Sequence, residues 1–140
     1  MIYLVDANVL SEPTKQMAKP RVVKWLDANE SNLIVDSIIL GELRMGILAL
    51  PNGRKRDRLE QWYQAVLETI DCISWDATIS QRWAALVVAL KQKGETVPLI
   101  DGMIAATALQ HDLVVATRNT RDFQKTGVKT LDPFSDAPVQ

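Results

Sequence analysis

Acidic side chains recur in similar settings along this chain, and their type and spacing could support metal chemistry. Asp6 directly follows the apolar run Ile2–Val5, and Asp122 lies in the loop expected after a later apolar run. Glu42 and Asp101 fall where helical spacing would place an apolar neighbour. A carboxylate in such a position loses hydration, which is costly when its charge is unpaired. Carboxylates that converge can share a divalent cation, because hard cations take oxygen ligands.

The elements that must position these acids alternate between strand and helix patterns, as in a parallel sheet covered by helices. Apolar stretches predict strands at 2–6, 32–35, 70–73 and 113–116, with a possible edge strand at 129–131. Apolar periodicity and capping residues predict helices at 20–28, 37–50, 59–67, 77–93 and 99–111. We expect one domain over residues 1–134 and a loosely ordered tail over 135–140.

The predicted topology can bring the acids together. In open α/β sheets, ligands bind beyond the carboxyl ends of the strands, near a switch in strand order. Asp6 ends the first strand, and Glu42 lies about one turn into the helix after the second strand, where Ile38, Ile39 and Met45 suggest a partly inward face. Asp101 opens its helix, where its charge could simply favour the helix dipole.

Single acids also have ordinary structural explanations, as turn or cap residues or as half-exposed side chains. Paired carboxylates could further indicate glycoside hydrolysis or, with an acid after the first strand, aspartyl phosphotransfer. Few aromatic platforms are available for a sugar, and Asn8 occupies the place where a phosphotransferase commonly needs a second Asp. Both alternatives therefore fit less well than a shared metal site.

Composition and charge indicate an ordinary globular domain with a basic remainder. The chain has 140 residues, of which 47% are hydrophobic and 24% are charged, and its net charge is −1. Setting the clustered acids aside leaves a net positive surface, which suits a polyanion held around a metal centre. The run 54–58 is basic, although a solvated helix face explains it equally well. Candidate RNA-binding residues are Arg44, Arg118 and Arg121.

Several classes of function are excluded by residue types that the chain lacks. Cys72 is the only cysteine, so an internal disulfide and a cysteine-based zinc site are excluded, and we expect its thiol in the core. His111 is the only histidine, which excludes a metal-free ribonuclease that uses a histidine pair. No apolar stretch approaches the roughly 18 residues of a membrane helix. Without a basic region before the first apolar run, we expect a cytoplasmic protein.

Four motifs in a fixed order resemble those of the PIN-domain ribonucleases, specifically the toxins of the VapBC and FitAB type. They are VDANVLSEP at 5–13, ILGELRMGI at 39–47, IDGMIAATALQHDLVVATRN at 100–119 and RDF at 121–123. The resemblance covers almost the whole chain. It implies a three-layer α/β/α sandwich with a central, mostly parallel sheet. It also implies metal-dependent hydrolysis of RNA phosphodiester bonds.

The resemblance also implies roles for individual residues. The acids that match the family's catalytic residues are Asp6, Glu42, Asp101 and Asp122, and the supporting residues are Asn8 and Asn119. We expect Asp6 and Asp101 to contact Mg²⁺ or Mn²⁺ directly, with the other two acids orienting water or binding a second ion. Ala7 departs from the family pattern, since a threonine or serine usually stands there. This departure removes a possible hydrogen bond but no metal ligand.

Partners follow from the same resemblance. A toxin of this type is neutralised by a small cognate antitoxin, whose Arg or Lys we expect to contact the acidic site. We also expect a homodimer, a heterotetramer or larger assembly with the antitoxin, and operator DNA bound through the antitoxin. The alternative function is a non-catalytic PIN-like binding module that acts in a DNA-bound repressor complex.

Overall fold

A five-stranded parallel sheet forms the centre of the fold. The computed structural model describes residues 1–140, and its strands follow the order β3-β2-β1-β4-β5. The strands are β1 (Tyr3–Val5), β2 (Leu33–Asp36), β3 (Asp71–Ile73), β4 (Val114–Ala116) and β5 (Thr130–Leu131). Tyr3 of β1 pairs with Leu33 on one side and with Val114 on the other, and every neighbouring pair is parallel. The predicted α/β class with a parallel sheet is confirmed.

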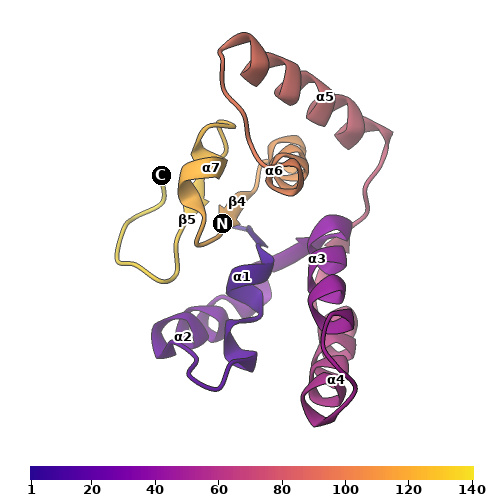
Figure 1. Ribbon diagram of the computed structural model, residues 1–140. Coiled ribbons are helices and arrows are strands. Elements are labelled where there is room, and N and C mark those ends of the chain that lie inside the picture. The colour runs from indigo at the N-terminus through magenta and orange to yellow at the C-terminus, as the bar shows by residue number, and fades with distance from the viewer.

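Helices connect the strands and flank the sheet (Figure 1). The α-helices are α1 (Ala7–Leu10), α2 (Pro20–Ala28), α3 (Ser37–Leu48), α4 (Arg54–Thr69), α5 (Ala77–Gln92), α6 (Leu99–His111) and α7 (Thr120–Gln124). Two 3-10 turns, η1 (Glu12–Thr14) and η2 (Glu30–Asn32), precede and follow α2. The helices predicted at 20–28, 37–50, 77–93 and 99–111 agree with α2, α3, α5 and α6 to within two residues, whereas α4 begins five residues before the predicted 59–67. No helix is long and apolar enough to cross a membrane.

Carboxylate caps fix where two of the long helices begin. Asp36 accepts a hydrogen bond from the backbone N–H of Ile39 at 2.8 Å, and Asp76 does the same for Ile79 at 2.8 Å. Each cap satisfies a backbone donor that has no partner within its own helix. The cap at Asp36 sets the start of α3, and therefore the position of Glu42 on that helix.

The strand order reverses between β1 and β4. From β1 the chain builds outward through β2 and β3, and it then returns to add β4 and β5 on the other side of β1. The carboxyl ends of β1 and β4 therefore flank the switch point, where ligands of open α/β sheets bind. The backbone N–H of Asp6 donates to the carbonyl of Ala116 at 2.9 Å, which ties these two strand ends together.

The core lies around the central strands. Leu4 and Val5 of β1, and Val115 of β4, have no exposed surface, as expected for strands covered on both faces. They pack with apolar residues of the flanking helices, including Ile39 of α3 and Ile104 of α6. The carboxyl ends of β1 and β4 are therefore held by rigid, fully packed segments.

Two details of the sequence prediction are wrong. Asp122 lies on the short helix α7 rather than in a loop. The side chain of Cys72 is exposed, because β3 is an edge strand, whereas we had expected a core position. The short helix α1, which follows β1 directly, was not predicted.

The C-terminal tail contacts the sheet edge. Gln140 and Thr130 exchange two backbone hydrogen bonds, at 2.8 and 2.9 Å, and Asp136 forms an ion pair with Arg21 of α2. The loose order expected for residues 135–140, and the single domain over 1–134, stay predictions.

Candidate active site

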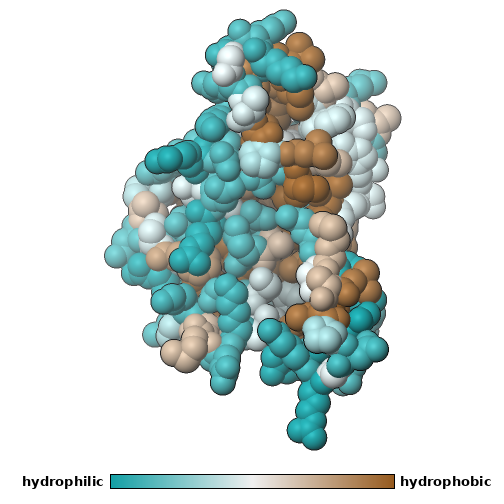
Figure 2. All heavy atoms as spheres, in the orientation of Figure 1, coloured by the Kyte–Doolittle hydropathy of each residue, from teal (hydrophilic) through white to brown (hydrophobic).

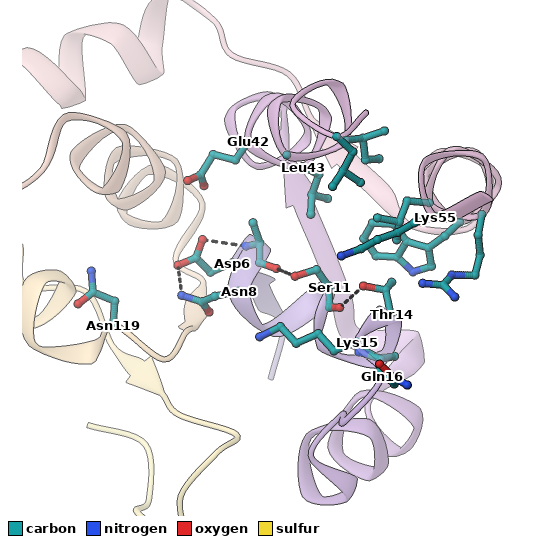
Figure 3. Close-up of a pocket in the computed structure, with 18 of the residues that line it drawn as sticks. Asp6, Asn8, Ser11, Thr14, Lys15, Gln16, Glu42, Leu43, Lys55 and Asn119 are labelled. Atoms are coloured by element: carbon teal, nitrogen blue, oxygen red, sulfur yellow. Dashed lines mark hydrogen bonds between the residues drawn. The ribbon is translucent and has the colours of Figure 1, made fainter. Parts of the chain in front are cut away.

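Asp6 is the buried centre of the acidic cluster. It stands between β1 and α1, and only 4% of its surface is exposed. Its Oδ1 accepts a hydrogen bond from the backbone N–H of Ala7 at 2.8 Å, and its Oδ2 accepts from Asn8 Nδ2 at 3.4 Å (Figure 3). Burial raises the pKa of Asp6, and hydrogen bonds from the Thr117 hydroxyl and the Ala7 backbone N–H partly offset this rise. The carboxylate is therefore fixed in position by its own loop.

Thr117 is a site residue that the sequence reasoning missed. Its hydroxyl lies at the end of β4 and donates to Asp6 Oδ2 at 2.8 Å, and both side chains are buried. The same hydroxyl accepts from the backbone N–H of Asn119 at 3.0 Å. Thr117 thus supplies Asp6 with the hydroxyl contact that Ala7 cannot make. The only sequence signal was a polar residue directly after a buried strand, the same setting as Asp6.

Asn119 joins the other two acids of the C-terminal half. Its Nδ2 donates to Asp101 Oδ2 at 2.8 Å and to Asp122 Oδ2 at 3.0 Å. Asp101 lies in the first turn of α6, and Asp122 lies in α7, one turn after Asn119. One amide therefore holds two carboxylates together. Asp122 also forms an ion pair with Lys125 at 3.6 Å.

Glu42 approaches the cluster from α3 on the other side of Asp6 (Figure 3). Its Oε1 is buried and has no hydrogen-bond partner. Burial, followed by the negative charges of Asp6, Asp101 and Asp36, raises the pKa of Glu42 to about 7. Burial and the charges of Asp6 and Asp122 likewise raise the pKa of Asp101 to about 6. Burial is the larger cause of both shifts, and repulsion between neighbouring carboxylates adds to it.

A fifth acid, Asp36, lies near the cluster at the start of α3 but does not line the groove. It is 1% exposed, and burial raises its pKa, with a further contribution from the charge of Asp6. The hydrogen bond from the backbone N–H of Ile39 partly offsets this rise in pKa. Asp36 Oδ2 and Thr107 Oγ1 are buried without a hydrogen-bond partner. Asp36 is occupied as the cap of α3, so it adds negative charge to the cluster without lining the groove.

The side chains present suit a hydrated divalent cation. An ionised carboxylate oxygen that is buried without a donor, such as Glu42 Oε1, is stabilised by a nearby positive charge. No group of three or more Asp, Glu, His or Cys side chains is arranged to hold an ion by itself. Mg²⁺ commonly keeps several waters and takes only one or two carboxylates directly, so the arrangement fits such an ion. Asp6 and Asp101 are the residues that would hold it.

The acids open into a groove of about 1540 Å³. Asp6, Glu42, Asp101 and Asn119 line one end of it, together with Asn8. The opposite end is formed by side chains of η1, α3 and α4. Asp122 does not line the groove and reaches it only through Asn119.

The arginines suggested as RNA contacts lie outside this groove. Arg44 forms an ion pair with Glu60 and stacks over the ring of Tyr63, with 5.6 Å between guanidinium and ring centroid. Arg118 stacks over Phe134 at 4.4 Å, while its backbone N–H donates to Asn8. Arg121 is exposed on α7.

Comparison with known proteins finds relatives of similar length. The PIN domain family model matches residues 3–129. Toxin FitB of Neisseria gonorrhoeae is 36% identical over 137 residues, covering 95% of this chain and 99% of that protein. VapC ribonuclease Y4jK of Sinorhizobium fredii is 33% identical over 138 residues, covering 96% and 99%. The structure of FitAB bound to an IR36 DNA fragment contains a chain with a TM-score of 0.91 and 32% identity, covering 98% of this chain and 99% of that chain.

Proposed function

This chain belongs to the PIN-domain family and is a ribonuclease of the VapC/FitB toxin type, and from that premise we propose that the acidic cluster is its metal-dependent nuclease centre. The observation that carries the proposal is the convergence of Asp6, Glu42 and Asp101 at one end of a single groove. Burial raises the pKa of all three, and neighbouring negative charges raise the pKa of Glu42 and Asp101 further. A cluster of unneutralised carboxylates is costly, and a bound cation removes that cost.

Each residue of the cluster has a separate task in this proposal. Asp6 is held rigidly by Ala7 and Thr117, and Asp101 is oriented by Asn119, so both present a carboxylate of fixed direction. A bound Mg²⁺ or Mn²⁺ supplies Lewis acidity, which offsets negative charge on the phosphate and makes a water molecule more acidic. These two acids would hold the ion.

Glu42 is the residue best placed to handle a proton. Its Oε1 has no competing hydrogen bond, and a carboxylate that titrates near neutrality suits general base catalysis. We assign the carboxylate of Glu42, which lines the groove, to orienting the attacking water and accepting its proton. Asp122 acts on the reaction only through Asn119, which it shares with Asp101.

The proposal is tested by incubating purified protein with a mixed-sequence RNA and separating the products on a gel. Cleavage should occur with Mg²⁺ or Mn²⁺, stop on addition of EDTA and return when excess metal is restored. Cleavage that continues at the same rate in EDTA would contradict a metal-dependent centre. An RNA left intact under every metal condition would contradict the proposed activity itself.

An antitoxin partner is also part of the proposal. The structure of FitAB on DNA is a complex of a relative with its partner and with DNA. We infer that this chain pairs with a VapB/FitA-like antitoxin, which carries the contact to operator DNA. An Arg or Lys of the antitoxin would pair with the carboxylates of Asp6 and Asp101 in place of the metal, because a guanidinium can bind carboxylates bidentately. We infer that the protein acts in the cytoplasm, where an RNA substrate would be found.

A homodimer is supported by apolar surface on the helices. Figure 2 shows hydrophobic residues gathered from the top of the displayed face down its right half, where Figure 1 places α5, α6 and α3. Val88 of α5 is 53% exposed, Leu99 of α6 is 63% exposed and Leu48 of α3 is 52% exposed. Exposed apolar patches commonly mark interaction sites. We propose that α5 and the start of α6 pack against a second copy of this chain.

A further inference from the structure

The groove extends well beyond the acidic cluster, to the beginning of α4. Arg54, Lys55 and Arg58 line this far end, and we call these three residues the basic rim. All three side chains are exposed, and none of them forms an ion pair. The groove therefore has a negative end and a positive end.

Other basic residues near the basic rim are paired with acidic side chains, whereas the residues of the rim are not. Arg56, on the same turn of α4, lies 3.9 Å from Glu60 and also donates to the carbonyl of Leu50. Lys15 lies on the opposite wall, and its amino group is paired with Glu12 at 3.0 Å. Free positive charge in the groove is thus concentrated on one wall, along α4.

The spacing along α4 suits a chain of regularly spaced anions. Arg54 and Arg58 are four residues apart on one helix face, which separates them by about 6 Å along the axis. Trp62 follows at the same interval, lines the groove and is partly exposed, so it adds an aromatic surface on which a base can stack. Figure 3 shows the Lys55 side chain extending from α4 toward the side of the groove where Asp6 lies.

We propose that the basic rim binds the phosphates of single-stranded RNA next to the bond that is cut, with the strand running along α4 toward Asp6. This inference rests on the proposed nuclease function and adds the path of the substrate. Unpaired cations on one wall are what a polyanion requires, and Arg54, Lys55 and Arg58 supply them. A row of unpaired cations fits the phosphates of a nucleic-acid strand better than the apolar face of a peptide helix.

The test compares Arg54→Gln/Arg58→Gln with Lys24→Gln/Lys129→Gln, a control that removes the same charge from exposed residues outside the groove and outside α5 and α6. Binding of a fluorescent twelve-nucleotide RNA is measured in EDTA over a range of salt concentrations. The groove variant should bind about tenfold to thirtyfold more weakly at 0.1 M salt, and its log–log salt slope should be shallower by about 1.4. The control should match the wild type.

Two further measurements separate this proposal from the nuclease assignment. Hydrolysis of bis(p-nitrophenyl) phosphate with Mn²⁺ should be unchanged in the groove variant, because this substrate is too small to reach the basic rim. Arg54→Lys/Arg58→Lys should restore most RNA binding, since a lysine keeps the charge. If the Arg54→Gln/Arg58→Gln variant had the RNA affinity and salt slope of the wild type, the proposal would be wrong, and a protein segment would be the better candidate for the groove. Since binding is measured without metal, that outcome is distinct from absent nuclease activity.

Discussion

The Thr117 hydroxyl donates a hydrogen bond of 2.8 Å to Asp6 Oδ2 across the point where the strand order reverses. Both side chains are buried, and each follows a central strand of the sheet. The contact is therefore made between two rigid segments that lie far apart in the sequence. It fixes the direction in which the other lone pairs of Asp6 point.

Replacing Thr117 should shift the carboxylate of Asp6 without removing it, because the Thr117 hydroxyl orients that carboxylate. Thr117→Val keeps the shape but removes the donor, so metal-dependent RNA cleavage should fall by about tenfold to hundredfold. The free energy of unfolding should fall by about 1–3 kcal/mol, because Asp6 Oδ2 loses a buried partner. Thr117→Ser, which keeps the hydroxyl, should retain most activity. Equal cleavage rates for the Val and Ser variants would contradict this role.

Because the pKa of Glu42 is raised, we expect the stability of the metal-free protein to depend on pH. The pKa is about 7 in the folded state, against an ordinary value of 4.5. Ionised Glu42 therefore destabilises the metal-free protein above pH 7, and this penalty disappears as the pH falls toward 4.5. In EDTA, Glu42→Gln should be more stable than the wild type by about 1–2 kcal/mol near pH 8, with the effect of the shift reduced by solvent screening.

Urea unfolding of both proteins at several pH values measures this difference directly. The two proteins should approach equal stability as the pH falls below 4.5, where Glu42 becomes protonated in the unfolded state as well as in the folded state. A stability gap that widens as the pH falls would mean that the carboxylate of Glu42 is stabilised, rather than strained, by its neighbours.

Metal should stabilise the folded protein through the same acids. Mn²⁺ at about one hundred times its Kd should add about 2.7 kcal/mol to the free energy of unfolding, because the unfolded chain does not assemble the site. Thermal melts with and without Mn²⁺ should show this gain in the wild type and most of its loss in Asp101→Asn. The exposed Asp27→Asn is a matched control and should respond like the wild type. If Asp101→Asn gained as much stability from Mn²⁺ as the wild type, Asp101 would not be a metal ligand.

Dimer formation should depend on the apolar surface of α5 and α6. Sedimentation of the wild type at micromolar concentration should give about twice the 15.6 kDa mass of one chain. Val88→Glu/Leu99→Lys should sediment as a monomer, because charged side chains are costly to bury in an interface. Met17→Lys changes an 87% exposed apolar residue outside these helices and should leave the dimer intact. A wild type that sediments at 15.6 kDa would refute the dimer.

The sequence predicted the parallel α/β fold and placed its long helices because these depend on local patterns. Apolar runs mark buried strands, and residues such as Asp36 and Asp76 mark helix starts. Strand order is not a local property, so Cys72 was misplaced in the core although β3 is an edge strand. The short helix that carries Asp122 was missed because five residues are too few for a periodic pattern.

The sequence identified the acids of the candidate site but missed Thr117, for a similar reason. Its acids stand out because a carboxylate in an apolar setting is unusual, and the structure brings Asp6, Glu42 and Asp101 to one groove. Thr117 gave only a weak signal, because a hydroxyl after a strand is common. The basic rim was visible as a charged run, but only the pairing of Arg56 with Glu60 distinguishes the residues that remain free to bind.

The most direct test of the nuclease centre is the rate of metal-dependent RNA cleavage by Asp6→Asn and Asp101→Asn, measured under single-turnover conditions beside Asp27→Asn. Each substitution removes one negative charge and changes side-chain size very little. Both site variants should lose at least about hundredfold in rate, since even groups that only orient metal ligands commonly contribute that much. The control should cleave at the wild-type rate. Wild-type rates in both site variants, at limiting Mg²⁺, would show that RNA is not cut at this cluster.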